Sequence, residues 1–375
     1  MIQLDPRVAR TAMQVLYAGL KVLPTNRSKV LFLSRQSNST PLDYSLLMEE
    51  LEDRNPDVVI KTISRRLDKG FKNNLYFSVD LARSMFHLAT SKVVVLDSYW
   101  PAVSVLEHKD DLVVFQMWHA LGKIKQSGKI TVGRPAGRDE RLAKVMRMHD
   151  GYDYVVAGGK AWNQYYMDSF GVDEDSLLNI GLPRADYLVN NREEIARRIF
   201  DTYPELQDAP IVLYAPTYRK GGGIAFGAKR LVARLEPAGY NVIVKGHANQ
   251  TLLAPDKKHW SCPEFTALEL LAVADYLVTD YSAIAIEAAL IDVKTFYYVH
   301  DFKRYARTNG LNLNVEKEMP RLAFRSTLGV ERALKKPYPW AEYERFKEKF
   351  LFEDPGHSTR DLADVLFEKG GLCTP

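Results

Sequence analysis

The chain has few cysteines and no long apolar run. Only Cys262 and Cys373 occur among 375 residues, too few for a disulfide framework and without the spacing of a zinc site, so we expect a reducing compartment. No uninterrupted apolar stretch approaches the ~20 residues of a membrane span. The N-terminus lacks the basic start, apolar core and cleavage site of a signal peptide. These absences favour a cytoplasmic protein.

Several binding motifs are missing as well. The histidines are scattered, and there is no Gly-rich loop ending in Lys-Ser/Thr. The run Gly221-Gly222-Gly223 after Arg219-Lys220 is not a dinucleotide fingerprint. We therefore predict no metal and no cofactor. A formal charge of +4 permits an anionic substrate or membrane surface but does not indicate nucleic-acid binding.

The chain alternates apolar strands with helices, and the alternation restarts after residue 187. Its length suits two domains, and its composition is that of a globular protein. Strand–helix alternation predicts parallel sheets covered on both faces, with ligands in a cleft at the carboxyl ends of the strands. We predict an α/β fold with two doubly wound, Rossmann-like domains facing a cleft. The predicted divisions are 1–187, 188–355 and a terminal helix in 356–375 that packs back on the first domain. The predicted strands are 29–34, 57–63, 92–96, 112–117, 154–157, 177–180, 211–215, 241–244, 276–279 and 293–298.

The first predicted helix, residues 7–23, is amphipathic. Its apolar face is flanked by Arg7, Arg10 and Lys21. Such a helix can lie on an anionic membrane surface or pack on its own domain. The local pattern slightly favours packing.

Residues 276–290 read as a strand, a polar turn and a helix. The turn is Thr279-Asp280-Tyr281-Ser282, and the helix begins near Ala283. Free N–H groups and the positive end of a helix dipole at such a turn bind phosphate, and Glu287 is placed to reach ribose hydroxyls. An ordinary strand–helix junction with a capping serine and a solvated Glu287 explains the local pattern equally well.

Polar side chains follow the predicted strands at corresponding points in both halves. His119 ends a strand of the first half, whereas Thr217, Arg219, His247 and Ser282 follow strands of the second. A lone histidine is more often structural, but two at equivalent strand ends are harder to dismiss. This set suits attack on a diphosphate, in which basic groups hold the phosphates and one histidine takes a proton from an acceptor hydroxyl.

Five motifs in this order give the chain a specific resemblance. They are Trp118-His119 with Gly122-Lys123, 181–186 (GLPRAD), 214–219 (YAPTYR), Lys245-Gly246-His247 and 279–283 (TDYSA). Together they resemble the CDP-glycerol glycerophosphotransferase family, the primases and polymerases of teichoic-acid synthesis. The likeness spans residues 29–320 and includes Tyr298, Asp301, Tyr305, Gly310 and Pro320.

The resemblance implies a GT-B-like fold with the nucleotide in the second domain. It implies that His119 deprotonates the acceptor and that His247 contacts the diphosphate. Ser282 and Ala283 would bind phosphate, and Glu287 would bind the ribose. Seven further residues are candidate substrate contacts: Thr217, Arg219, Lys245, Thr279, Asp280, Arg184 and Lys123. Three of them also have a structural explanation. Asp280 can shape its loop, Arg184 can form part of a hinge, and Lys123 can belong to a solvated basic run with Lys125 and Lys129.

The expected reaction transfers a polyol phosphate from a CDP-polyol to a hydroxyl of a lipid-linked or polymeric glycan, releasing CMP. We expect the enzyme on the inner face of the cell membrane. The motifs depart from the family at Ala120-Leu121, Ala283, Lys245 and Asn314, so CDP-ribitol stays open beside CDP-glycerol. Two alternatives remain: a GT-B nucleotide-sugar transferase or epimerase, and a non-catalytic module that binds an anionic polymer through its basic run.

Overall fold

Two parallel sheets organise the molecule. A computed structural model describes residues 5–66, 71–217, 219, 224–246 and 260–373. The first sheet has the strand order β2-β1-β3-β4-β5-β6 and the second β11-β10-β9-β7-β8. All strand pairs of the described residues are parallel, which confirms the predicted α/β class. The strands are β1 (Asn26–Ser34), β2 (Val59–Ser64), β3 (Ser91–Leu96), β4 (Val113–Gln116), β5 (Tyr154–Val156), β6 (Leu177–Leu178), β7 (Ile211–Tyr214), β8 (Asn241–Val244), β9 (Tyr276–Thr279), β10 (Lys294–Tyr298) and β11 (Ala323–Phe324).

Each sheet reverses its strand order once. In the first sheet β1 lies between β2 and β3, and in the second β7 lies between β8 and β9. At such a switch point the loops after the two neighbouring strands diverge, and a crevice forms at their carboxyl ends. The two switch points are therefore where a doubly wound protein is expected to bind ligands.

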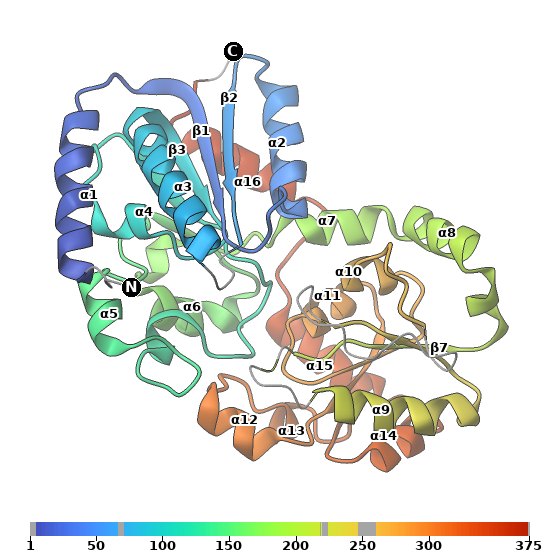
Figure 1. Cartoon of the computed structure of the whole chain (residues 1–375). Coiled ribbons are helices and arrows are strands. Elements are labelled where there is room, and N and C mark those ends of the chain that lie inside the picture. Colours follow the sequence, from blue (N-terminus) through green and yellow to red (C-terminus); the bar gives the residue numbers. More distant parts are fainter. Residues whose placement is uncertain (1–4, 67–70, 218, 220–223, 247–259, 374–375) are drawn as a thin grey trace.

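The strands are apolar because both faces of each sheet are covered. Residues 30–33 of β1 and 93–96 of β3 are fully buried, as expected for central strands between helical layers. Figure 1 shows helices on both sides of the first sheet, with α1 and α3 on one side and α2 and α16 on the other. One hydrophobic cluster includes side chains from both halves, and Trp162 packs on Phe350 with ring centroids 4.5 Å apart.

The long helices lie close to where the sequence predicts them, whereas most of the short ones were missed. A helix of one or two turns offers too few repeats for its 3.6-residue period to be recognised. The predicted helix 266–273 shortens to α10 (Ala267–Leu270), because Leu271 and Ala272 close tighter turns on Leu268 and Glu269. The missed helices are α4 (Pro101–Val105), α5 (Glu140–Val145), α6 (Asn163–Phe170), α7 (Pro183–Asn190), α12 (Phe302–Thr308), α13 (Val315–Glu318) and α14 (Thr327–Leu334). The predicted helices that formed are α1 (Pro6–Leu20), α2 (Leu42–Arg54), α3 (Phe71–Thr90), α8 (Arg192–Thr202), α9 (Ile224–Leu235), α11 (Ile284–Leu290), α15 (Trp340–Phe350) and α16 (Ser358–Glu368).

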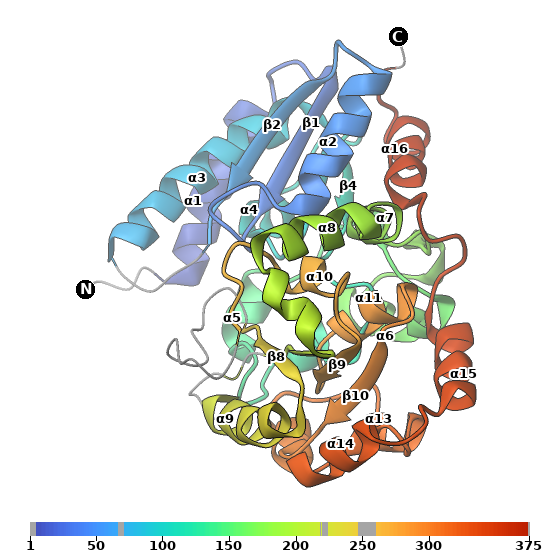
Figure 2. The ribbon, with the colours of Figure 1, turned by 90° about the vertical axis from the view of Figure 1, so that its right-hand side faces the viewer.

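The chain crosses between the two halves more than once. After α15 it returns to the first half, where α16 packs on α2 and α7 (Figures 1 and 2). The Asp186 carboxylate of α7 accepts hydrogen bonds from the backbone N–H groups of Ser358 and Thr359, at 2.9 and 2.7 Å, and so fixes the start of α16. The predicted division after residue 187 falls inside α7 and stays a prediction.

The first helix packs on the domain through part of its surface. Met13 and Tyr17 are buried, and the Tyr17 hydroxyl lies 2.8 Å from His108 Nδ1. The helix ends at Leu20, three residues before the predicted end. No helix within the described ranges combines the length and apolar character needed to cross a bilayer.

Candidate functional site

A cavity of about 200 Å³ opens at the switch point of the first sheet. It lies where the loops after β1, β3 and β4 meet the starts of α2 and α7. The pocket therefore contains two predicted site residues, His119 and Arg184, and carboxylates that the sequence analysis did not select. Its lining residues are Gln36, Pro41, Asp43, Tyr44, Asp97, Met117, His119 and Arg184.

The geometry of the loop after β4 positions His119. Trp118 adopts a left-handed backbone conformation with φ of 61°, which turns the chain sharply at the strand end. The His119 Nδ1 atom lies 2.8 Å from the backbone oxygen of Asp97. A carbonyl can only accept, so Nδ1 carries the proton and Nε2 keeps its lone pair. The Trp118 ring lies against the imidazole, with centroids 4.0 Å apart.

Burial and nearby cations keep the His119 imidazole neutral. The pKa of His119 is lowered to about 3, mainly by burial and to a smaller extent by the cations Arg184, Lys125 and Lys123, against the opposing effect of the Asp97 carbonyl. At neutral pH the imidazole is therefore uncharged, with its single proton on Nδ1. A neutral imidazole with a free Nε2 can accept a proton from a hydroxyl, as the sequence analysis expects.

Asp97 organises the floor of the pocket. Its carboxylate accepts hydrogen bonds from the hydroxyls of Ser34 (2.5 Å) and Ser98 (2.8 Å). Burial raises the pKa of Asp97 to about 6, although these hydrogen bonds oppose the shift. Asp97 is not among the predicted site residues, although it directly follows β3 and so meets the same strand-end criterion as His119.

Arg184 connects the two halves of the molecule. It begins α7, and its Nε lies 2.9 Å from Asp43 Oδ2 while its backbone N–H donates to Asp43 Oδ1 at 2.8 Å. On the other side, its Nη1 lies 3.9 Å from Glu287 Oε1 of α11. Arg184 therefore binds a buried carboxylate of the first half, lines the pocket, and faces the second half.

The second switch point gathers Thr217, Arg219 and Asp280. The Thr217 N–H donates to Asp280 Oδ1 at 2.8 Å, which ties the loop after β7 to the loop after β9. Arg219 donates to Asp280 Oδ2 at 2.7 Å and to Asp301 Oδ2 at 2.9 Å, with its guanidinium 4.4 Å from the centroid of Tyr305. Asp280 thus shapes the loop, which is the structural role that the sequence offered for it beside a substrate contact. Asp301 completes a cluster that local sequence reasoning alone did not assemble.

Two buried polar atoms at this edge have no partner within the described ranges. They are the Thr217 hydroxyl and Glu287 Oε2, in side chains that are each 4% exposed. Burial raises the pKa of Glu287 to about 7, even though the Arg184 charge opposes it. An unpaired buried polar atom costs about 1–3 kcal/mol. A ligand that supplies hydrogen-bond partners would remove that cost.

The turn before α11 presents free backbone N–H groups. The helix runs from Ile284 to Leu290, with Ala283 at its N-cap and no side-chain cap. Within the described part of the chain, the N–H groups of Ser282 and Ala283 meet no acceptor. Thr279 is different, because its buried hydroxyl donates to the Ala215 carbonyl at 2.7 Å and so joins β9 to β7.

Two of the predicted substrate contacts, Lys245 and Lys123, make contacts within the protein and do not line the pocket, and a third predicted residue lies outside the described ranges. The Lys245 ammonium donates to the carbonyls of Cys262 (2.7 Å) and Ser261 (3.3 Å), on its own side of the second sheet. Lys123 is buried, as described next. His247 lies outside the described residues, so the predicted opposition of two histidines across the cleft stays a prediction.

The basic run after His119 is not a solvated face. Lys123 is 2% exposed and lies inside an aromatic box, with its Nζ at 4.6, 5.0 and 4.3 Å from the centroids of Trp118, Tyr166 and Phe170. Lys129 pairs with Asp150 at 2.7 Å. The interpretation of this run as an exposed basic patch is therefore wrong. Residues two apart in an irregular loop face different neighbours, and the sequence cannot show which.

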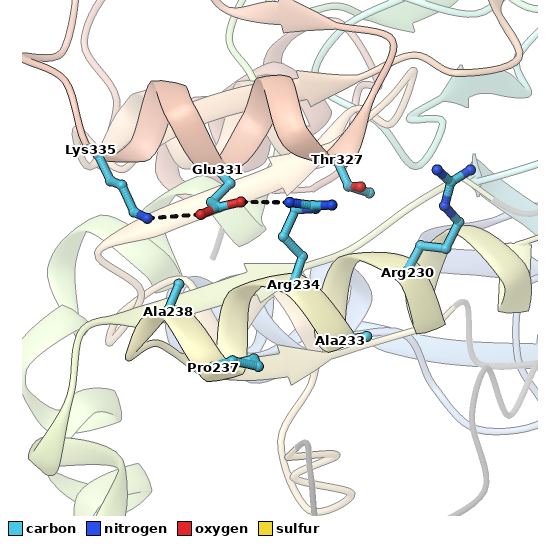
Figure 3. A pocket seen from close by; sticks show the side chains of 8 residues that line it. All are labelled: Arg230, Ala233, Arg234, Pro237, Ala238, Thr327, Glu331 and Lys335. Carbon is cyan, nitrogen blue, oxygen red and sulfur yellow. Dashed lines mark hydrogen bonds and ion pairs between the residues drawn. The ribbon is translucent and has the colours of Figure 1, made fainter.

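A second hollow, of about 500 Å³, lies between α9 and α14, away from both strand-end sites (Figure 3). Figure 3 shows Glu331 between Arg234 and Lys335, which donate to it at 2.9 and 2.8 Å. These opposite charges already satisfy one another. In the ranges that the structure describes, no cluster of three His, Cys, Asp or Glu residues is arranged to bind a metal.

Comparison with known sequences gives a consistent result. The family model for CDP-glycerol:poly(glycerophosphate) glycerophosphotransferases matches residues 15–368. A teichoic acid ribitol-phosphate primase of Bacillus spizizenii is 25% identical over 367 residues, which cover 92% of this chain and 92% of the primase. A teichoic acid glycerol-phosphate primase of Bacillus subtilis is 26% identical over 299 residues, which cover 77% of this chain and 76% of that primase.

Comparison with solved structures supports the fold. The wall teichoic acid polymerase TagF superposes with a TM-score of 0.75 at 17% identity, over 97% of this chain and 98% of the TagF chain. The UDP complex of MnaA from S. aureus superposes with a TM-score of 0.61 at 12% identity, over 92% and 98% of the two chains. These superpositions establish the α/β, GT-B-like fold with two parallel sheets, and at such low identity the chemistry must be argued from the residues of the site.

Proposed function

This chain belongs to the CDP-glycerol:poly(glycerophosphate) glycerophosphotransferase family, and we propose that it transfers a polyol phosphate from a CDP-polyol to a glycan hydroxyl, releasing CMP. The acceptor is a lipid-linked or polymeric glycan. The observation that carries the proposal is the state of His119: neutral, hydrogen-bonded through Nδ1, and lining a pocket at the first switch point.

The proposed step is a single displacement at phosphorus. The acceptor oxygen attacks the phosphorus that carries the polyol, and its proton passes to His119 Nε2. The new oxygen–phosphorus bond forms as the bond from that phosphorus to the bridging oxygen breaks. The electron pair of the broken bond leaves with CMP. An anionic donor bound nearby would raise the pKa of His119 and so make it a stronger base.

The second switch point is the proposed donor site. The Thr217 hydroxyl and the free Glu287 oxygen are buried and lack partners among the described residues. Nucleotide and ribose hydroxyls can donate to Glu287, and phosphate oxygens can accept from the N–H groups of Ser282 and Ala283. His247 is proposed to contact the diphosphate from the same half. Arg219 is already bound to Asp280 and Asp301, so we assign it to shaping this site.

The polyol is glycerol or ribitol. Curated relatives that are similar over most of this chain include a ribitol-phosphate primase and a glycerol-phosphate primase, so similarity alone does not choose between them. The direct experiment measures nucleotide release by purified protein: CMP from CDP-glycerol and from CDP-ribitol, and UDP or UMP from a UDP-sugar as the control donor. We expect CMP from one or both CDP-polyols and neither UDP nor UMP from the UDP-sugar.

Ligand protection against thermal unfolding, measured beside turnover, separates the rival functions. A nucleotide-sugar transferase or epimerase would be protected against thermal unfolding by a UDP-sugar and left unaffected by CDP-polyols. A polymer-binding module would show no turnover and would bind through exposed cations. The burial of Lys123 and the pairing of Lys129 with Asp150 weigh against that module.

Attachment to an anionic membrane surface is proposed through α1 and α3. These helices pack on each other (Figure 2), and both expose large apolar side chains. Arg7 lies exposed at the start of α1. Exposed apolar groups beside a cation favour binding at the interface of an anionic bilayer. The exposed side chains are Val8 (55%), Val15 (71%) and Leu16 (52%) on α1, and Leu75 (54%), Tyr76 (53%), Val79 (51%) and Phe86 (46%) on α3.

Vesicle sedimentation tests this attachment. The wild-type protein is expected to sediment with vesicles containing phosphatidylglycerol and to stay in solution with purely phosphatidylcholine vesicles. Val15→Glu combined with Leu16→Glu should abolish the sedimentation while leaving CMP release intact, because both side chains are exposed. Equal sedimentation of the variant would remove α1 from the proposal.

A further inference from the structure

Three lysines of one short segment have three different environments. Lys123 is enclosed by aromatic rings, and Lys129 is paired with Asp150. Lys125 is partly buried, and its ammonium makes no hydrogen bond or ion pair to any residue that the structure describes. A cation that is partly removed from water and has no hydrogen-bond or ion-pair partner is costly, so such a group is a candidate ligand contact.

The backbone around Lys125 is fixed across the interface between the halves. Lys125 forms an antiparallel bridge with Leu311, and the Gln126 N–H donates to the Gly310 carbonyl at 3.2 Å. The Asn312 amide donates to the carbonyl of Lys123 at 2.8 Å. A segment of the first half is thereby attached to residues 310–312 of the second. Lys125 is held between the halves by main-chain contacts that do not use its side chain.

The surroundings of the ammonium belong to both candidate sites. Lys125 interacts electrostatically with Asp280 and Arg219 of the second switch point and with His119 of the first. The Asp280 carboxylate already accepts from the N–H groups of Thr217 and Tyr281 and from Arg219. Asp280 therefore attracts Lys125 without forming a hydrogen bond to it, and the ammonium keeps its donors for another group.

We propose that Lys125 is a catalytic residue whose ammonium binds the diphosphate of the CDP-polyol from the first half, opposite the N–H groups of Ser282 and Ala283. It donates hydrogen bonds to phosphate oxygens in the bound donor. It also stabilises the negative charge that stays on CMP when the bond to the bridging oxygen breaks. This role rests on the proposed function and adds a cation to a site whose Arg219 is bound by two carboxylates.

A binding comparison tests the ground-state contact. Lys125→Met removes the charge and keeps the chain length, and Lys129→Met is the matched control four residues along the same segment. Each protein is titrated with cytidine, CMP and CDP-glycerol, and with CDP-ribitol in parallel. We expect Lys125→Met to bind the preferred CDP-polyol about 10- to 100-fold more weakly and cytidine as the wild type does, because only the phosphates meet the ammonium. Lys129→Met should bind every ligand like the wild type.

Turnover tests the transition-state role. We expect Lys125→Met to lower kcat for CMP release by about 100-fold or more, and Lys125→Arg to recover part of it, since a guanidinium keeps the charge. Thermal unfolding of Lys125→Met and Lys125→Arg checks that both fold. The inference would be overturned if Lys125→Met bound the donor and released CMP as well as the wild type. It would also be overturned if Lys125→Met bound cytidine as weakly, relative to the wild type, as it bound the CDP-polyol. Absence of CMP release by the wild type would instead overturn the proposed function.

Discussion

The two halves of this molecule have the same sheet topology around their switch points but treat the polar groups there differently. In the first half β1 is flanked by β2 and β3, and in the second β7 is flanked by β8 and β9. Around His119 the polar side chains that line the pocket are hydrogen-bonded to protein groups, and beside them only Arg35 Nε, directly after β1, is buried without a partner within the described ranges. Around Thr217 and Glu287, buried polar atoms lack partners within the described ranges.

This difference indicates two ways of preparing a site. The first half holds the proposed base, His119, in position before any ligand arrives, because Asp97, whose carbonyl accepts from His119, forms a hydrogen-bonded network with Ser34 and Ser98. In the second half, buried polar atoms of Thr217 and Glu287 have no hydrogen-bond partner within the described ranges, so a bound ligand could supply those partners. A transferase needs a base fixed in one geometry, whereas its donor site gains affinity and specificity from groups that only the correct donor satisfies. The following tests address this contrast, beginning with the largest expected effect.

Removing the preorganised base should affect turnover alone. We expect His119→Ala to lower kcat for CMP release by about 10²- to 10⁴-fold, the usual contribution of a positioned general base. Donor affinity measured by calorimetry should stay close to the wild-type value, because His119 is proposed to act on the acceptor hydroxyl and is not among the proposed donor contacts. His357→Ala, at an exposed position before α16, is the control. Undiminished activity of His119→Ala would end the assignment of the base.

Removing Arg219 should destabilise the second half. Its side chain is 11% exposed and lies between Asp280 and Asp301, so Arg219→Met leaves two carboxylates facing each other. We expect the free energy of unfolding to fall by about 3–5 kcal/mol in urea titrations at neutral pH. Arg325→Met breaks the exposed pair with Glu316 and should change stability little. Equal losses of unfolding free energy in the two variants would show that burial of the Arg219 cluster does not make its ion pairs more important for stability than an exposed pair.

The open oxygen of Glu287 should make stability depend on pH. The folded pKa of about 7 lies above the ordinary value of 4.5, so the folded protein keeps a proton that the unfolded chain loses between these values. The free energy of unfolding therefore falls as pH rises from about 4.5 to 7, by about 3 kcal/mol. Glu287→Gln should remove this dependence and be more stable than the wild type at pH 8. Parallel stability curves for the two proteins from pH 5 to 8 would contradict the buried, unsatisfied state of Glu287.

The smallest expected effect compares one buried hydroxyl from each half. Thr217→Val removes a hydroxyl without a described partner and keeps its shape, so the unliganded protein should gain about 1 kcal/mol of stability. Tyr44→Phe removes a hydroxyl that donates to the Leu33 carbonyl at 2.8 Å, and should lose about 1 kcal/mol. Thr217→Val should also weaken CDP-polyol binding. If both substitutions lowered the free energy of unfolding, the Thr217 hydroxyl would have a partner like that of Tyr44, and the proposed difference between the two halves would be wrong.

Much of the fold and part of the site were predictable from the sequence. Apolar runs of four to eight residues, each followed by a polar group, predicted the strands and placed His119, Thr217 and Asp280 at strand ends. The same rule would have selected Asp97, and only the bias toward histidine left it out. Short helices such as α6 and α14 were missed, because one or two turns carry too little periodicity.

Other features of the site were not legible in the sequence. Asp43 and Arg184 are 141 residues apart, and no local pattern links the first turn of α2 to the start of α7. The different environments of Lys123, Lys125 and Lys129 depend on which neighbours an irregular loop meets, including residues 310–312 of the other half.

The sequence by itself determined the strand–helix alternation, the order of the family motifs and the strand-end position of the proposed base, because these depend on neighbouring residues and short periodicities. Only the tertiary structure decided which charges are neutralised, which polar atoms are left without partners and which lysine lies between the halves. Burial and charge pairing are set by groups far apart along the chain, and they exist only after the two sheets have packed together.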